Sequence, residues 1–278
     1  MRKINPYILT LLIPVIFFNC TKEANDLLDD NEKFYNNNPD VNAMVKFIHA
    51  YTPLTLNGLA TGTNGFRITM DGTKVNGATN TSATTNTLMY GGNIGATNYT
   101  VSFFPTTNSY TFLNPGLRNI KFIMNRITGG NFAPITGDEI FNTNLTLTGG
   151  KKYSIFIADP FPSPNVLQVT DNLPDVERGK FALRLVNVCG DVNSKFDLVS
   201  RRFGNLFTNV SYREVKDFVI MDLPSISDTI YLRTAGTTTN ITTFNGFIPA
   251  PERVYTFFIR GNAAVAGRTA NLNYYTNW

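Results

Sequence analysis

The sequence is a succession of short apolar runs, rich in β-branched and aromatic residues, that turn residues interrupt at regular intervals. Turn-forming pairs such as Asp71-Gly72, Asn76-Gly77 and Asn245-Gly246 stand between these runs. No long stretch has the period of an amphipathic helix. Regularly spaced strands without helical crossovers predict an all-β chain built of antiparallel β-sandwiches. The expected strands lie at 45–49, 66–70, 99–104, 120–124, 144–147, 153–158, 182–188, 196–199, 217–222, 229–233 and 254–260.

Three segments recur in the same order in the two halves of the chain. Residues 46–49 correspond to 184–187, 66–68 to 196–198, and 145–157 to 246–259. This order predicts two tandem β-sandwich domains, at 43–158 and 180–278. Four prolines, Pro160, Pro162, Pro164 and Pro174, occur in the segment 159–179 between them. We expect this segment to be a stiff linker without a continuous strand or helix.

The N-terminus has the pattern of a bacterial lipoprotein signal peptide over residues 1–20. Arg2 and Lys3 precede an apolar run at 7–18, and Cys20 follows it. The run is shorter than the roughly 20 apolar residues that cross a membrane, and it fits the central region of a secretory signal. Cys20 is therefore predicted to be lipidated and to become the first residue of the mature chain. Asn19 replaces the usual small residue, so cleavage without lipid is the alternative.

Residues 21–42 are acidic and rich in Asn and show no hydrophobic period, which predicts a flexible tether. Their acidic side chains favour a solvated linker over a metal site. The segment 21–23, Thr-Lys-Glu, resembles the short signal that sends Bacteroidetes lipoproteins to the cell surface. The predicted location is the outer membrane, facing outward, with the membrane as partner through the lipid at Cys20.

Charge and cysteine content restrict the partners and the chemistry. Without Arg2 and Lys3 the net charge of +4 falls to +2, which gives no electrostatic case for nucleic acid. With Cys20 lipidated, the mature chain keeps Cys189 alone and has no partner for an intramolecular disulfide. Cys189 ends an apolar run, so we expect a small buried residue and not a nucleophile. No cofactor is predicted.

A family resemblance appears at the strand openings. Residues 45–50, VKFIHA, are followed by Pro53 and by 66–72, FRITMDG, and residues 150–154, GKKYS, supply a closing element. This pattern resembles the secreted bacterial family called domain of unknown function 4397, over most of 43–260. The resemblance implies an immunoglobulin-like sandwich outside the cytoplasm and supplies no catalytic residues. The second copy departs from the pattern at Asn187, which stands where the first has His49, and lacks the Asp-Gly turn.

No catalytic constellation is evident. His49 is the only histidine, and no Gly-x-Ser-x-Gly elbow accompanies it, so we expect a partly buried imidazole that bonds a neighbouring loop. A zinc site lacks ligands, and no calcium-loop pattern occurs. Paired carboxylates, Asp138-Glu139 or Asp222 with Asp228, leave a hydrolase as an alternative. We predict that the protein is not an enzyme.

The leading hypothesis is a lipid-anchored envelope protein that acts as a binding, structural or adhesion module. Its alternative is a glycan-binding lipoprotein of a polysaccharide-uptake system, since aromatic rings in polar loops can stack on sugars. Thr229, in Asp228-Thr229-Ile230, also resembles an O-glycosylation site. The candidate ligand contacts to a glycan or an envelope protein are Tyr51, Tyr90, Tyr110, Tyr212 and Trp278.

Overall fold

The structure is a computed structural model that describes residues 38–51, 65–75, 88–89, 103–105, 109–125, 138–158, 165–262 and 269–277. The regular elements of these residues are all β-strands, which confirms the predicted all-β class. The described part contains no helix long and apolar enough to cross a membrane. Cys20, Tyr90, Trp278 and the predicted tether up to residue 37 lie outside the described residues.

The strands before residue 171, the first half, form two sheets. The inner sheet has the order β10-β9-β1-β5, with β6 also paired to β1, and the outer sheet has the order β3-β2-β7-β8, with β4 paired to β2. The strand bounds are β1 Ala43–His49, β2 Gly65–Met70, β3 Thr73–Lys74, β4 Leu88–Met89, β5 Phe103–Phe104, β6 Thr111–Leu113, β7 Gly116–Asn125, β8 Asp138–Leu147, β9 Lys152–Ala158 and β10 Asn165–Thr170.

The strands after residue 179, the second half, repeat this arrangement with four strands in each sheet. Their inner sheet has the order β14-β11-β17-β18 and their outer sheet the order β13-β12-β15-β16. The strand bounds are β11 Lys180–Asn187, β12 Phe196–Ser200, β13 Gly204–Val210, β14 Val219–Asp222, β15 Asp228–Thr234, β16 Asn240–Phe247, β17 Val254–Arg260 and β18 Asn271–Thr276.

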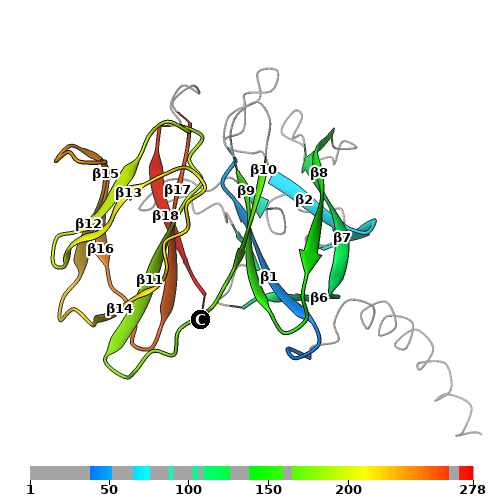
Figure 1. Ribbon diagram of the computed structural model, residues 1–278, viewed down its shortest axis with the longest axis horizontal. Coiled ribbons are helices and arrows are strands. Elements are labelled where there is room, and N and C mark those ends of the chain that lie inside the picture. The colour runs from blue at the N-terminus through cyan, green and yellow to red at the C-terminus, as the bar shows by residue number, and fades with distance from the viewer. Residues whose placement is uncertain are drawn as a thin grey trace, which may run out of the picture.

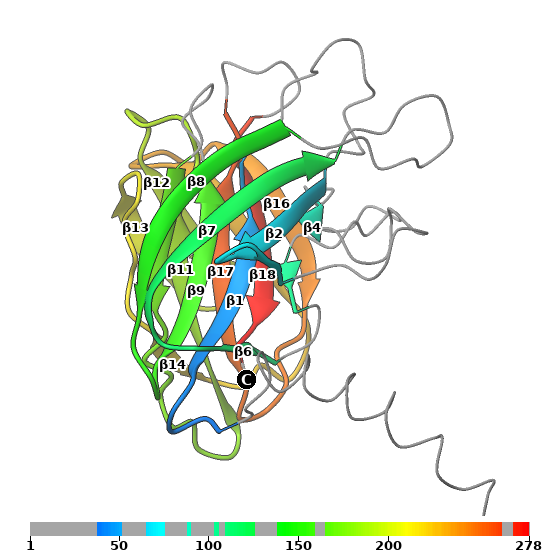
Figure 2. The same ribbon diagram turned by 90° about the vertical axis from the view of Figure 1, so that its right-hand side faces the viewer.

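The four sheets stack in the order outer, inner, inner, outer, so the two inner sheets face one another (Figure 1). Turned by a quarter, the molecule shows the outer sheet of the first half crossing in front of β1 and β9 (Figure 2). One core fills each sandwich, around Phe47 and Phe122 in the first half and around Phe257 and Leu198 in the second. A third apolar cluster fills the space between the inner sheets, and the two halves are therefore packed directly together.

Strand direction differs from the prediction at one pair in each half. β1 pairs with β9, and β11 with β17, in parallel, whereas the other ladders are antiparallel. Because both faces of an inner sheet are covered, these four strands are buried along almost their whole length, and their residues are mostly apolar instead of alternating. The sandwich prediction is confirmed, but hydrophobic periodicity carries no information on direction, and the all-antiparallel detail was wrong.

The predicted linker 159–179 contains a strand. β10 lies inside it and pairs with β9, from Asn165 against Ala158 to Thr170 against Tyr153. Pro174 comes after this strand, and the other three prolines, at 160, 162 and 164, precede it. The expectation that proline keeps the whole segment irregular was wrong, because a strand fits between the prolines without including one.

Candidate functional site: a buried polar network between the halves

Polar side chains from both halves meet in the space between the two inner sheets. Lys46 on β1 and Ser154 on β9 face this space because their neighbours Phe47 and Ile155 face the first core. Arg184 on β11 and Thr256 on β17 reach it from the other side. Tyr110, Asp171, Tyr275 and Asn277 complete the group, and each is at most 8% exposed.

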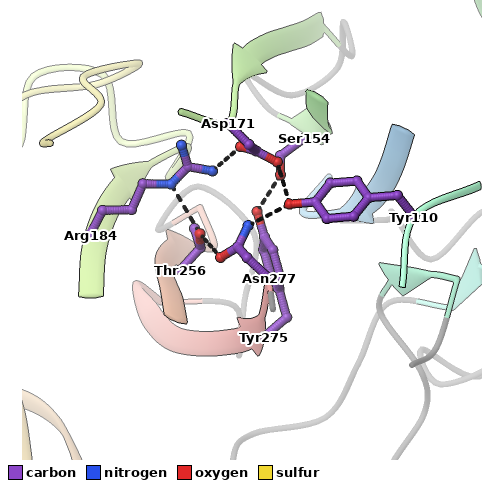
Figure 3. A network of polar contacts seen from close by, with 7 residues as sticks. All are labelled: Tyr110, Ser154, Asp171, Arg184, Thr256, Tyr275 and Asn277. Carbon is purple, nitrogen blue, oxygen red and sulfur yellow. Dashed lines mark hydrogen bonds and ion pairs between the residues drawn. The ribbon is translucent and has the colours of Figure 1, made fainter. Parts of the chain in front are cut away.

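Asp171 is the centre of this network (Figure 3). Its carboxylate accepts hydrogen bonds from Tyr110 Oη at 2.8 Å and from Ser154 Oγ at 2.7 Å, both in its own half. It also forms a buried ion pair with the guanidinium of Arg184, across the interface. A buried carboxylate is tolerated when its oxygens are satisfied in this way. Asp171 therefore binds the second half to the first.

A second set of bonds runs through the C-terminal residues. Asn277 Nδ2 donates to Tyr110 Oη at 3.0 Å, and Thr256 Oγ1 donates to Asn277 Oδ1 at 2.6 Å. Arg184 Nε donates to the same threonine hydroxyl at 3.0 Å. Together with the Asp171 contacts, these bonds form a continuous path from Tyr110 in the first half into the second (Figure 3).

Two further contacts cross the interface. Tyr275 Oη donates to Ser154 Oγ at 2.7 Å. At the edge of the inner sheet, Arg213 Nη2 donates to the carbonyl oxygen of Val166 on β10 at 3.0 Å. Around these polar contacts, Phe156 and Phe258 pack edge to face with their ring centroids 5.7 Å apart. The interface thus combines satisfied hydrogen bonds with apolar burial.

The two halves contribute equivalent positions to the network. Lys46 is opposite Ser154 in its ladder, as Arg184 is opposite Thr256. Asp171 and Asn277 also correspond. Each directly follows the last strand of its half. Each backbone N–H donates at 2.8 Å to the carbonyl oxygen of the first residue of the neighbouring strand, Lys152 of β9 or Val254 of β17. An acid in one half thus corresponds to an amide in the other.

Burial changes the ionisation of the network. Burial by itself would lower the pKa of Arg184, but the adjacent Asp171 carboxylate reverses the direction and raises it. Burial raises the pKa of Tyr275 to about 12 and raises the pKa of Tyr110 still further, with Asp171 acting in the same direction. Both tyrosines therefore stay neutral and can donate their hydroxyl hydrogens over the physiological range.

Lys46 has a different environment from its counterpart Arg184. Its Nζ lies 5.4–5.7 Å from the ring centroids of Phe103, Tyr110 and Tyr275 and donates to the carbonyl oxygen of Pro105 at 3.4 Å. Burial lowers the pKa of Lys46 to about 8, and the nearby Asp171 only partly offsets this effect. The cation rests mainly on ring faces, which attract it through their quadrupoles.

The chemistry that this arrangement supports is structural. Asp171 and Arg184 bind one another, and Lys46 and Asp171 are at most 5% exposed, so neither presents a reactive atom at the surface. Among the described residues no group of three or more His, Cys, Asp or Glu side chains is arranged to hold a metal ion. The network joins two sandwiches, and a ligand would have to separate the inner sheets to reach it.

The predicted ligand-contact tyrosines do not come together. Tyr51 is 5% exposed and packs in the first core, while Tyr110 is 8% exposed and belongs to the network. Stacking of either ring on a sugar would require the interior to open. Tyr212 is half-buried, between β13 and β14. Tyr90 and Trp278, like Cys20, lie outside the described residues.

The other candidate residues have structural surroundings. His49 is buried on β1, and Cys189 is buried with its Sγ donating to the carbonyl oxygen of Gly261 at 3.2 Å, which confirms that this cysteine is an interior residue. Asp228 is buried and accepts from Ser200 Oγ, whereas Asp222 is exposed. Thr229 Oγ1 donates to Asn245 Oδ1 at 3.4 Å. The backbone of Asp138 and Glu139 lies on β8.

Sequence reasoning missed Asp171 and Asn277. Asp171 falls inside the segment taken for a linker, and Asn277 stands one residue from the end of the chain. The signal that could have found them was the alignment of Lys46 with Arg184. Two basic residues at equivalent positions of apolar strands require buried counter-charges, and Asp171 is one of the few acids in the segment 159–179 between the halves.

Comparison with known proteins gives one family match. The family described as Domain of unknown function (DUF4397) matches residues 43–194, which includes the first half and β11. No curated protein matches. Two solved structures match at low similarity. The Bacillus anthracis TIE protein is 11% identical with a TM-score of 0.20, over 80% of this chain, and the chain spans only 34% of that protein. A candidate cell adhesion protein from Bacteroides fragilis is 10% identical with a TM-score of 0.20, over 84% of this chain and 97% of its own.

Proposed function

Because the chain belongs to the DUF4397 family, whose description assigns no activity, we propose that it is a non-catalytic binding or structural module of the cell envelope, held there by a lipid on Cys20. The observation that carries this proposal is the buried network. Its ionisable groups, led by Asp171 and Arg184, are used to fuse two sandwiches into one body. A body of this kind presents a fixed set of loops and sheet edges to a partner.

The proposal includes a second copy of the family domain in residues 180–278, after the first in 43–158. The equivalent ladders of Lys46 and Arg184 support this. So does a repeated turn: Tyr153 Oη accepts from the backbone N–H of Thr148 at 3.1 Å, and Tyr255 Oη accepts from that of Ala250 at 2.8 Å. Both tyrosines reach back five residues, to the turn before their own strand.

The proposed location is the outer membrane, with the domains facing outward. The basic start, the short apolar run and Cys20 support export and lipidation, and the Thr-Lys-Glu segment at 21–23 supports transfer to the surface. The acidic, Asn-rich residues that follow would act as the tether.

The proposal is tested by replacing the lipid-bearing residue. In the Cys20→Ala chain, the protein should leave the membrane fraction and lose incorporation of labelled palmitate, because the thioether that carries the lipid cannot form. Asn19→Gly is the matched control, since it restores the usual small residue before Cys20 and should leave membrane retention intact or increase it. Retention of Cys20→Ala in membranes after washing at high pH would contradict the lipid anchor.

A glycan is the second candidate partner, and an exposed amide cluster favours it. On the outer sheet of the first half, Asn119 Nδ2 donates to Asn142 Oδ1 at 2.7 Å and to Asn144 Oδ1 at 2.9 Å. Fixed amides can bond sugar hydroxyls. A glycan array probed with the chain should then give signals that Asn142→Ala and Asn144→Ala remove together, and an array without signal would rule this candidate out.

A further inference from the structure

Exposed apolar side chains gather at one end of the molecule, which we name the tether end because the described chain enters there at Asn38. It carries Leu117 at 69% exposure, Ile226 at 65% and Ile248 at 74%, together with Val41 and Phe203. Exposed apolar residues scattered singly are ordinary, but a set at one end points to a contact surface.

The topology places these residues together because equivalent strands of the two halves run in the same direction. The rings of Phe156 and Phe258, each the fifth residue of its strand, meet across the interface. Two residues earlier, Ser154 of β9 bonds Tyr275, which is the ladder partner of Thr256 on β17, so the two strands run in the same direction. The turns that precede these strands therefore lie at the same end, as do the start of β1, the start of β11 and the C-terminus (Figure 1).

Two of the apolar residues belong to the first half. Leu117 near the start of β7 pairs with Thr146 near the end of β8, immediately before the turn into β9. The backbone of Val41 lies against Gly149 in that turn, so closely that a Cβ on the glycine would meet the Val41 carbonyl oxygen. Leu117 and Val41 thus flank one turn at the tether end.

The other three belong to the second half and are linked by backbone contacts. Arg202 Nε donates to the carbonyl oxygen of Ser227 at 3.3 Å, which joins the turn of Phe203 to the loop of Ile226. Phe247 pairs with Asp228, which brings Ile248 to the same loop. Phe203, Ile226 and Ile248 therefore form the apolar tip of the second half.

The charges at this end are mixed. Arg201, Arg202 and Arg253 are exposed beside the apolar tip, and Asp222 and Glu252 are exposed near them. Arginine side chains can extend from an apolar contact toward phosphate groups. Because the two acids offset most of this positive charge, attraction to this end depends mainly on apolar contact and should change little with ionic strength.

The length of chain before Asn38 decides which surface this end meets. Residues 21–37 separate Cys20 from the described part, and a flexible chain of that length has a root-mean-square span of about 20–25 Å and a maximum of about 60 Å. A lipid on Cys20 would hold the tether end at high effective concentration beside the bilayer, where even weak contacts are populated.

We propose that the tether end docks on the lipid surface of the membrane that holds Cys20, with Phe203, Ile226 and Ile248 entering the headgroup region and Leu117 and Val41 beside them. This inference rests on the proposed lipid anchor. The strands of both halves would then rise away from the bilayer, and the opposite end, where Val192 is 47% exposed, would face outward.

An environment-sensitive fluorophore tests the contact. The lipidated full-length chain with Ile248→Cys, labelled at that cysteine, is reconstituted in vesicles of phosphatidylethanolamine and phosphatidylglycerol that contain spin-labelled lipids. We expect a blue-shifted emission that the lipid-borne quencher reduces at least about twofold and that added salt leaves unchanged. Val192→Cys with the same label is the matched control at the opposite end and should show neither effect. Cys189 is buried, and unlabelled background is read from the parent chain.

Each outcome decides the proposal. Quenching of the label at 248 by aqueous iodide instead of by lipid would overturn docking, since the site would be open to water. Shielding from both quenchers in native envelopes would assign the tip to a protein partner and also overturn it. Release of Cys20→Ala from membranes, together with an unquenched label at 248, would leave the anchor standing and reject docking alone. If the Cys20→Ala chain stays on membranes, Ile226→Ser and Ile248→Ser are added to it. Release of this triple variant supports docking, and its retention overturns docking.

Discussion

At the scale of the residue, the difference between Lys46 and Arg184 is instructive because they occupy equivalent positions. The guanidinium of Arg184 pairs with Asp171 while its Nε bonds Thr256. The compact ammonium of Lys46 has ring faces and one carbonyl oxygen among its neighbours. The planar guanidinium of arginine suits a buried ion pair, because it is weakly hydrated and matches the geometry of a carboxylate. The ammonium of lysine is compact and strongly hydrated, so it is less suited to burial. Two cations therefore share one carboxylate, and the lysine is the one that burial destabilises.

Lys46 predicts a rise of stability with pH. Its proton is released near pH 8 in the folded protein and near the ordinary value of 10.5 in the unfolded chain. Between these values Lys46 binds more protons in the unfolded state, so its contribution to the free energy of unfolding increases with pH by roughly 3 kcal/mol, and below about pH 8 the cost of the buried charge is fully present. Lys46→Met lacks the buried charge, so relative to the parent chain its free energy of unfolding should be higher at about pH 7 than at about pH 10.5, by that amount. Urea unfolding at the two pH values measures this difference.

Lys46 faces the titratable groups Asp171, Tyr110 and Tyr275, and Asp171 in turn pairs with Arg184. Burial keeps both tyrosines protonated in the folded protein, so above about pH 10 they lower the stability of the parent chain and of Lys46→Met alike, and the difference between the two chains reports the lysine. Lys151→Met, in an exposed turn, controls for the loss of any lysine. A pH effect as large in Lys151→Met as in Lys46→Met would contradict the assignment.

At the scale of the element, the turns before β9 and β17 are built alike. In each, a tyrosine of the strand sends its hydroxyl back to a backbone N–H of the turn, from Tyr153 to Thr148 and from Tyr255 to Ala250. Both tyrosines lie in their own core, which leaves the hydroxyl as the only polar group to satisfy. The turn and the following strand are thus fixed together by one side chain.

The two tyrosine bonds should contribute independently. Tyr153→Phe and Tyr255→Phe each remove one acceptor while keeping the ring, so each should lower the free energy of unfolding by about 0.5–1.5 kcal/mol. Since the bonds lie in different halves, the double variant should lose about the sum. Equilibrium urea unfolding measures all three. If the double variant is as stable as the less stable of the two single variants, the two turns are coupled or the hydroxyls are bonded elsewhere, and the prediction is wrong.

The strands were predictable where a run of apolar, β-branched or aromatic residues stands between turn residues. The runs at 45–49, 153–158 and 254–260 fall within β1, β9 and β17. Strand direction was not predictable, because parallel and antiparallel neighbours bury the same residues. β10 was missed because its flanking prolines resemble a linker. Of the network, the repeat marked only the positions of Lys46 and Arg184, and Asp171 and Asn277 were missed because they follow the last strand of each half, where no period applies.

At the scale of the whole molecule, the interface between the halves resembles the inside of a domain. Phe156, Phe258 and Tyr275 are buried between the inner sheets together with Ile48 and smaller residues. The polar network crosses the same space with its donors and acceptors paired. Inter-domain contacts are ordinarily more polar and more open than this. A buried interface of this character couples the folding of the two parts that share it.

The two halves should therefore unfold in a single transition, with equal calorimetric and van 't Hoff enthalpies. Phe258→Ala removes a ring from the interface and should cost about 3–5 kcal/mol while separating the transition into two, because each sandwich keeps its own core. Phe257 is the matched control: it is the preceding residue, equally buried, and faces the core of the second half. Phe257→Ala should lower the melting temperature with the halves still coupled. Differential scanning calorimetry distinguishes these results, and two transitions in the parent chain would show that the halves are joined only by their chain connection.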